Sequence, residues 1–123
     1  MIGISVIRVL VVDDQPAFCR FVRQTMVTSD DLRVVAEAHD AASALKIIAR
    51  MELDLVLMDI DMPGMDGLEA TALIRSRFPS IRVVTMSGHE DAEYRRLALQ
   101  AGAIEFIPKN EFSLRRIREA LAK

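Results

Sequence analysis

The feature that most constrains this chain is an alternation of short apolar runs with longer stretches of helical period. The apolar runs are rich in Val, Ile or Leu and have the length of strands, at residues 6–12, 32–38, 55–58, 82–86 and 103–107. Apolar side chains recur at helical spacing after each run, within residues 18–26, 44–48, 68–73, 94–101 and 114–121. This alternation predicts a chain of the order (βα)5.

Several of the predicted strands lack a polar face. Residues 9–12 and 55–58 are apolar at every position, which is typical of strands in a parallel sheet with helices on both faces. Helix boundary signals agree, with Pro16 in a first turn, Asp40 and Ser113 as candidate N-caps and Gly102 after a helix end. We therefore expect an α/β fold with a doubly wound parallel sheet, and a strand order of 2-1-3-4-5 would bring the first and third strands together.

Size, charge and residue usage exclude several classes of protein. A length of 123 residues predicts one domain, residues 1–123. The net charge of −2 lacks the excess of positive charge that is typical of proteins that bind the nucleic-acid backbone. One Cys cannot form an internal disulfide, and one Cys with two His cannot complete a four-ligand zinc site. No apolar run approaches the ~18 residues of a membrane span, so we expect a cytoplasmic protein that contacts neither membrane nor nucleic acid.

Polar residues follow four of the predicted strands. Because ligands bind beyond the carboxyl ends of parallel strands, we expect these residues to converge on one site, formed by Asp13, Asp14, Asp59, Asp61, Ser87, Gly88 and Lys109. Neighbouring carboxylates repel one another, and a divalent cation would compensate them. Magnesium prefers oxygen ligands and is usually held by one or two protein carboxylates, a number that Asp14 and Asp59 fit.

The same residue types suit one reaction. A carboxylate can act as a nucleophile and form an aspartyl phosphate. Lys109 would neutralise a phosphoryl oxygen, while the Ser87 hydroxyl and nearby backbone N–H groups would donate to the other oxygens. The predicted chemistry is therefore phosphoryl transfer to an aspartate.

Four segments together resemble the receiver domain of bacterial two-component response regulators, a flavodoxin-like fold shared with chemotaxis regulators: residues 9–14, 57–69, 85–88 and 101–109. The resemblance implies that Asp59 is the phosphoacceptor. It also implies Mg²⁺ as the cofactor, held by Asp59, by Asp14 directly, by the Asp61 backbone carbonyl and by Asp13 through water. Ser87, Gly88 and Lys109 match the phosphate-binding positions, and Phe106 matches an aromatic switch residue without the phenolic hydroxyl.

The resemblance also implies partners. The phosphoryl donor would be a sensor histidine kinase or a phosphotransfer protein, and the chain would be a signalling domain that catalyses only its own phosphorylation and dephosphorylation. The phosphorylated state would favour a surface formed by the fourth helix, fifth strand and fifth helix, where an output partner or a second copy docks. Residues 32–48 resemble the branch of DNA-binding transcription factors.

Two other functions are compatible with parts of the sequence. Asp59 and Asp61 also resemble the nucleophile pair of haloacid dehalogenase-like phosphatases, although that family usually needs a longer chain. An interaction module could keep the receiver fold without phosphorylation, although nothing structural requires the complete set of site residues. Cys19 lies among apolar residues and is predicted to pack in the core, and His39 and His89 are predicted to lie in different loops.

Overall fold

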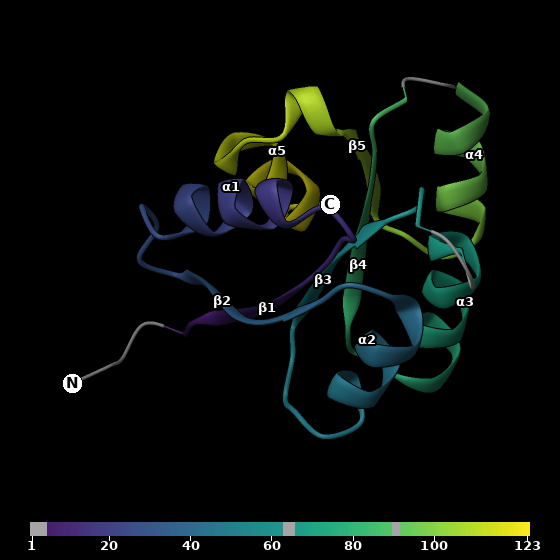
Figure 1. The fold of residues 1–123 in the computed structure, drawn as a ribbon, viewed down its shortest axis with the longest axis horizontal. Coiled ribbons are helices and arrows are strands. Elements are labelled where there is room, and N and C mark those ends of the chain that lie inside the picture. The colour runs from purple at the N-terminus through teal and green to yellow at the C-terminus, as the bar shows by residue number, and fades with distance from the viewer. Residues whose placement is uncertain (1–4, 63–65, 90–91) are drawn as a thin grey trace.

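The computed structural model describes residues 5–62, 66–89 and 92–123, so part of the segment 57–69 lies outside the described residues. Five strands alternate with five α-helices, as the sequence predicts (Figure 1). The elements are β1 (Ile7–Val12), α1 (Pro16–Met26), β2 (Leu32–Ala38), α2 (Ala41–Ile48), β3 (Leu55–Asp59), α3 (Gly67–Arg77), β4 (Arg82–Ser87), α4 (Ala92–Gln100), β5 (Glu105–Pro108), the short 3₁₀ helix η1 (Lys109–Glu111) and α5 (Leu114–Leu121).

The sheet confirms the expected topology. Its strands lie in the order β2-β1-β3-β4-β5, and the pairs within the sheet are parallel. The crossover from β2 to β3 passes over β1, so β1 and β3 become neighbours with Val12 opposite Met58. The carboxyl ends of these two central strands therefore lie side by side.

Both faces of the sheet are covered by helices, and the pattern of β1 shows why its run is apolar throughout. Val9 and Val11 pack in one core cluster with residues of α1 and α5, whereas Leu10 and Val12 pack in another with residues of α2 and α3. Figure 1 shows α1 and α5 on one side of the sheet and α2, α3 and α4 on the other. Successive side chains of a strand point to opposite faces, so a strand covered on both faces must be apolar at every position.

Local signals fix the ends of the helices. Pro16 is the first residue of α1, and the side chains of Asp40 and Ser113 accept hydrogen bonds from the backbone of Ser43 and Arg116, which confirms both predicted N-caps. Gly102 ends α4 with a φ of 109°, a conformation that favours glycine.

Strand boundaries differ slightly from prediction. β3 and β4 extend to Asp59 and Ser87, so these two site residues are the last residues of their strands and do not follow them. β5 begins at Glu105 instead of Ala103, because the Ala103 N–H donates to Ala98 and is still part of the helix end. Among the described residues, no helix is long and apolar enough to cross a membrane.

Candidate functional site

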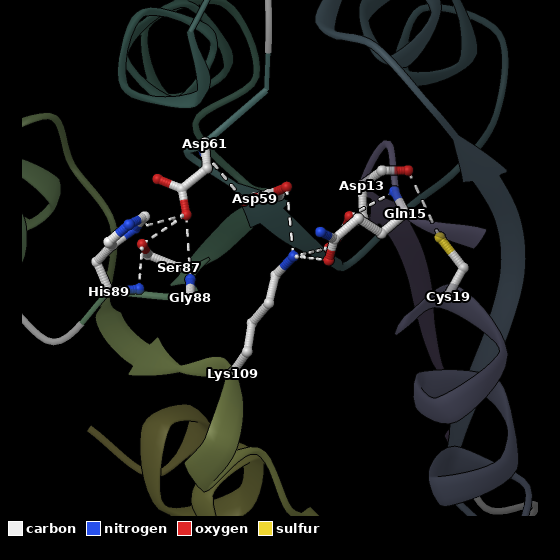
Figure 2. Close-up of polar contacts among 9 residues, drawn as sticks. All are labelled: Asp13, Gln15, Cys19, Asp59, Asp61, Ser87, Gly88, His89 and Lys109. Carbon is white, nitrogen blue, oxygen red and sulfur yellow. Dashed lines mark hydrogen bonds and ion pairs between the residues drawn. The ribbon is translucent and has the colours of Figure 1, made fainter. Parts of the chain in front are cut away.

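Strand ends bring acidic and basic side chains together at the carboxyl edge of the sheet (Figure 2). Asp13 follows β1, Asp59 ends β3 and Lys109 follows β5. The Lys109 ammonium lies 2.7 Å from Asp13 Oδ2 and 3.5 Å from Asp59 Oδ2. Residues separated by almost the whole chain therefore form one charged cluster, as the sequence predicts.

The two carboxylate oxygens of Asp13 have different surroundings in this cluster. Its side chain is fully buried, and Oδ1 accepts a hydrogen bond of 2.8 Å from the backbone N–H of Gln15. Within the described part of the chain its Oδ2 atom accepts no hydrogen bond, and its close partner is the Lys109 ammonium. A buried carboxylate oxygen in this situation is a natural ligand for a cation.

Lys109 is held in place from several sides. Its ammonium also donates to Gln15 Oε1 at 3.1 Å and lies 4.7 Å from the centre of the Phe18 ring. Burial lowers the pKa of Lys109, but the close ion pair with Asp13 together with the negative charge of Asp59 outweighs burial and holds that pKa above its ordinary value. Lys109 is therefore a fixed positive charge at neutral pH.

The buried Asp59 carboxylate lies between a backbone donor and the Lys109 ammonium. Its Oδ1 accepts a hydrogen bond of 3.0 Å from the backbone N–H of Asp61, which leaves Oδ2 facing Lys109. Burial raises the pKa of Asp59 to about 6, and the negative charges of Asp13 and Asp61 add to the rise, against the lowering effects of the Asp61 N–H and of Lys109. At pH 7 the group is still mostly ionised, so it retains its nucleophilic form.

Three carboxylates make this edge a candidate cation site. Asp13, Asp14 and Asp59 each offer one oxygen, and these oxygens lie within 4.8 Å of one another. Asp14 is exposed, while the other two are buried, so an ion could keep waters on the open side. An all-oxygen donor set with room for water fits magnesium.

Ser87 and Gly88 lie on the other side of Asp59, but they engage a partner that the sequence did not indicate. The Ser87 hydroxyl donates to Asp61 Oδ2 at 2.7 Å, and the Gly88 N–H donates to the same oxygen at 3.1 Å. His89 Nδ1 lies 3.5 Å from that oxygen, and the backbone N–H of His89 donates to Ser87 Oγ at 3.0 Å. The donors expected to hold a phosphoryl oxygen thus hold a carboxylate oxygen here.

Phe106 lies apart from these polar residues. Its ring is buried in an apolar cluster with Ile60, Ala98 and Ala103, and its carbonyl accepts a hydrogen bond from Arg95. The cluster connects the end of β3 with α4 and β5. A change near Asp59 could therefore reach this ring through packing, and its role as a switch stays a prediction.

Comparisons with known proteins agree with this geometry. The family model for the response regulator receiver domain matches residues 9–122. The chain is 41% identical over 111 residues to a protein-glutamate methylesterase/protein-glutamine glutaminase of Pyrococcus abyssi, covering 88% of this chain and 30% of that protein. It is 31% identical over 103 residues to the transcriptional regulatory protein DegU of Brevibacillus brevis, covering 84% of this chain and 44% of that protein.

A solved structure extends the comparison to the fold. The signal receiver domain of the response regulator NarL from Mycobacterium tuberculosis superposes with a TM-score of 0.85 at 35% identity. The match covers 97% of this chain and 99% of that domain. In contrast, the chain spans less than half the length of the two curated relatives above.

Proposed function

The chain belongs to the family of response regulator receiver domains, and on that premise we propose that Asp59 is the residue that accepts the phosphoryl group. The observation that carries this proposal is the environment of Asp59 Oδ2. This oxygen is buried at the end of β3, 3.5 Å from the Lys109 ammonium, in a group of carboxylates that can hold a cation.

The hydrogen bonds of Asp59 distinguish its two oxygens. The Asp61 N–H occupies Oδ1, so Oδ2 is the oxygen that attacks phosphorus, and a new O–P bond forms as the bond to the donor breaks. The donor's leaving group keeps the electron pair of the broken bond: acetate leaves acetyl phosphate as an anion, whereas a histidine leaving group takes up a proton from solvent and leaves as neutral imidazole. Lys109 neutralises charge on the transferred group through its fixed ammonium.

Magnesium is the proposed cofactor, held by Asp14 and Asp59, by the Asp61 backbone carbonyl and by Asp13 through water. When bound, the ion supplies positive charge that offsets both the crowded carboxylates and the phosphoryl oxygens. Asp13 then has two positive neighbours, because it already lies 2.7 Å from Lys109 Nζ.

Ser87 and Gly88 connect phosphorylation to a change of shape. We infer that they release the Asp61 carboxylate and donate instead to a phosphoryl oxygen on Asp59. This exchange moves the end of β4, and Phe106 transmits the movement by ring packing to a surface formed by α4, β5 and α5. A partner that binds this surface better in one state shifts the population towards that state.

The partners follow from the family. A sensor histidine kinase or a phosphotransfer protein is the proposed donor, and the output is a partner protein, an attached domain or a second copy of the chain. The proposed setting is the cytoplasm. The chain is a signalling domain, and we propose that it catalyses only the gain and loss of its own phosphoryl group.

Intact mass after incubation with acetyl phosphate tests this function. One phosphoryl group should be gained with Mg²⁺, and none without Mg²⁺ or in Asp59→Asn. No gain under any condition would favour the phosphorylation-independent interaction module. Turnover of many phosphate esters per chain would favour the phosphatase alternative.

A further inference from the structure

A second group of metal-ligating side chains lies between α1 and β2. Cys19, Glu37 and His39 bring a sulfur, a carboxylate oxygen and an imidazole nitrogen within 4.8 Å of one another. We propose that these three residues form a binding site for Zn²⁺, separate in its chemistry from the oxygen-only site at Asp59.

The fold brings the three residues together from two elements. Cys19 is on the face of α1 that packs against the sheet, and its side chain is buried. Glu37 is near the end of β2, an edge strand, and His39 follows that strand directly. The three ligands therefore share a seam that is closed on the helix side and open on the side of His39, whose side chain is 56% exposed.

Existing contacts already orient the carboxylate and the imidazole. Glu37 Oε1 accepts a hydrogen bond of 2.9 Å from Arg23 Nε, which leaves Oε2 directed at His39 Nε2 at 2.7 Å. Two ligand atoms of a tetrahedral zinc ion, each about 2.0–2.1 Å from the metal, lie about 3.3 Å apart, so binding would exchange this hydrogen bond for two coordination bonds and shift the exposed His39 side chain outward. Arg23 would then act as an outer partner that fixes the carboxylate, as is common around bound metals.

The donor set determines the choice of metal. Zinc binds sulfur, nitrogen and oxygen ligands, and three protein ligands leave a fourth position for water, whereas magnesium requires oxygen ligands. Hydrogen bonds from Arg23 and His39 hold the pKa of Glu37 below its ordinary value, so the carboxylate is charged at neutral pH. Burial, together with the negative charges of Glu37 and Asp13, raises the pKa of the Cys19 thiol to about 12, and the thiol donates to the Asp13 backbone carbonyl at 3.6 Å. A metal ion at Cys19 must therefore displace this proton to solvent and bind the thiolate in its place, so binding strengthens as pH rises.

Cobalt titration in the presence of excess Mg²⁺ tests the proposal on the whole chain. Co²⁺ bound to a thiolate gives a charge-transfer band in the near ultraviolet, and Cys19 is the chain's single cysteine, so a band can arise only there. We expect a band that saturates at one equivalent and disappears when Zn²⁺ is added. The oxygen-only site cannot produce this signal, so the result does not depend on the function of Asp59.

Three variants assign the ligands. Cys19→Ser should abolish the band, and the exposed side chain of His39 allows His39→Ala to test the site without disturbing the core. His39→Ala should weaken Co²⁺ binding more than about tenfold, because loss of even an outer partner of a metal ligand costs about 10–100-fold in affinity. The control His89→Ala, which changes the other histidine, should bind as the original chain does. Absence of the band with Co²⁺ in large excess, or unchanged affinity in His39→Ala, would overturn the proposal.

Discussion

Replacing Asp59 by Asn should stabilise the metal-free protein at neutral pH. Burial raises the pKa of Asp59 from 3.8 to about 6, so the folded state binds its proton more tightly than the unfolded state does. Since each tenfold change in proton affinity is worth about 1.4 kcal/mol, the ionised group costs the fold about 3 kcal/mol at pH 7. Asn removes this cost, keeps an acceptor for the Asp61 N–H and leaves Lys109 paired with Asp13 at 2.7 Å.

The sign of the pH dependence follows from the same shift. An acid whose pKa is higher in the folded state loses stability as pH rises from its unfolded value towards its folded value, here from about 4 to about 6. The advantage of Asp59→Asn should therefore fall from about 3 kcal/mol at pH 7 to about half of that at pH 5.

Urea unfolding in EDTA at the two pH values measures this difference. The matched control is Asp30→Asn, which removes the same charge from an exposed position in the loop between α1 and β2. The control should change the free energy of unfolding by less than about 0.5 kcal/mol at either pH. An Asp59→Asn variant that is no more stable than the original chain at pH 7 would refute the reasoning.

Further predictions concern the other parts of the site. Lys109→Met leaves two buried carboxylates without their counterion and should lower the free energy of unfolding at pH 7 by about 3 kcal/mol. Urea unfolding should show a smaller loss of stability at pH 5. Asp61→Ala frees the Ser87 hydroxyl from its hydrogen bond and should speed phosphorylation by acetyl phosphate about tenfold. This factor corresponds to one hydrogen bond to a charged group, worth ~1.5 kcal/mol. An unchanged rate in a mass-spectrometric time course would contradict this prediction. Gly67→Ala places a Cβ 2.4 Å from a β3 carbonyl oxygen and should destabilise the fold by about 1–3 kcal/mol. A Cβ at Gly88 has no atom of the described residues within 4 Å, so Gly88→Ala should leave urea unfolding nearly unchanged.

The fold could be predicted from local features of the sequence. Continuous apolar runs such as residues 9–12 require burial on both faces, and capping residues such as Asp40 and Ser113 act within one helical turn. The boundaries of β3 and β4 were less well predicted, because Asp59 and Ser87 use their backbones for strand pairing although their side chains are polar.

For the candidate site, the sequence predicts which residues lie at the ends of the strands, but not the contacts that their side chains make. Parallel strands place their carboxyl ends at one edge of the sheet, which brings Asp13, Asp59 and Lys109 together independently of the conformation of the loops. The Asp61 side chain was missed because its contact with Ser87 depends on the path of the loop after β3. No local signal gives that path.

The cluster of Cys19, Glu37 and His39 between α1 and β2 likewise combines a predictable feature with one that depends on the folded structure. Cys19 was correctly predicted to be buried among apolar residues, yet its sulfur also faces Glu37 and His39. These residues are 18 and 20 positions away along the chain, and only the packing of a helix against the edge strand brings them near. A sequence pattern identifies which side of a helix is buried. It does not identify which polar groups of the neighbouring strand that side contacts.

The position of the phosphoryl group in the chain can be measured directly. Borohydride reduces an aspartyl phosphate to homoserine, so protein phosphorylated with acetyl phosphate and Mg²⁺ can be reduced, digested and sequenced by mass spectrometry. Phosphorylation of Asp59 should give homoserine at position 59 and unmodified Asp at positions 13, 14 and 61. Homoserine at any of those three positions, or at none, would contradict the assignment of Asp59 as the phosphoacceptor.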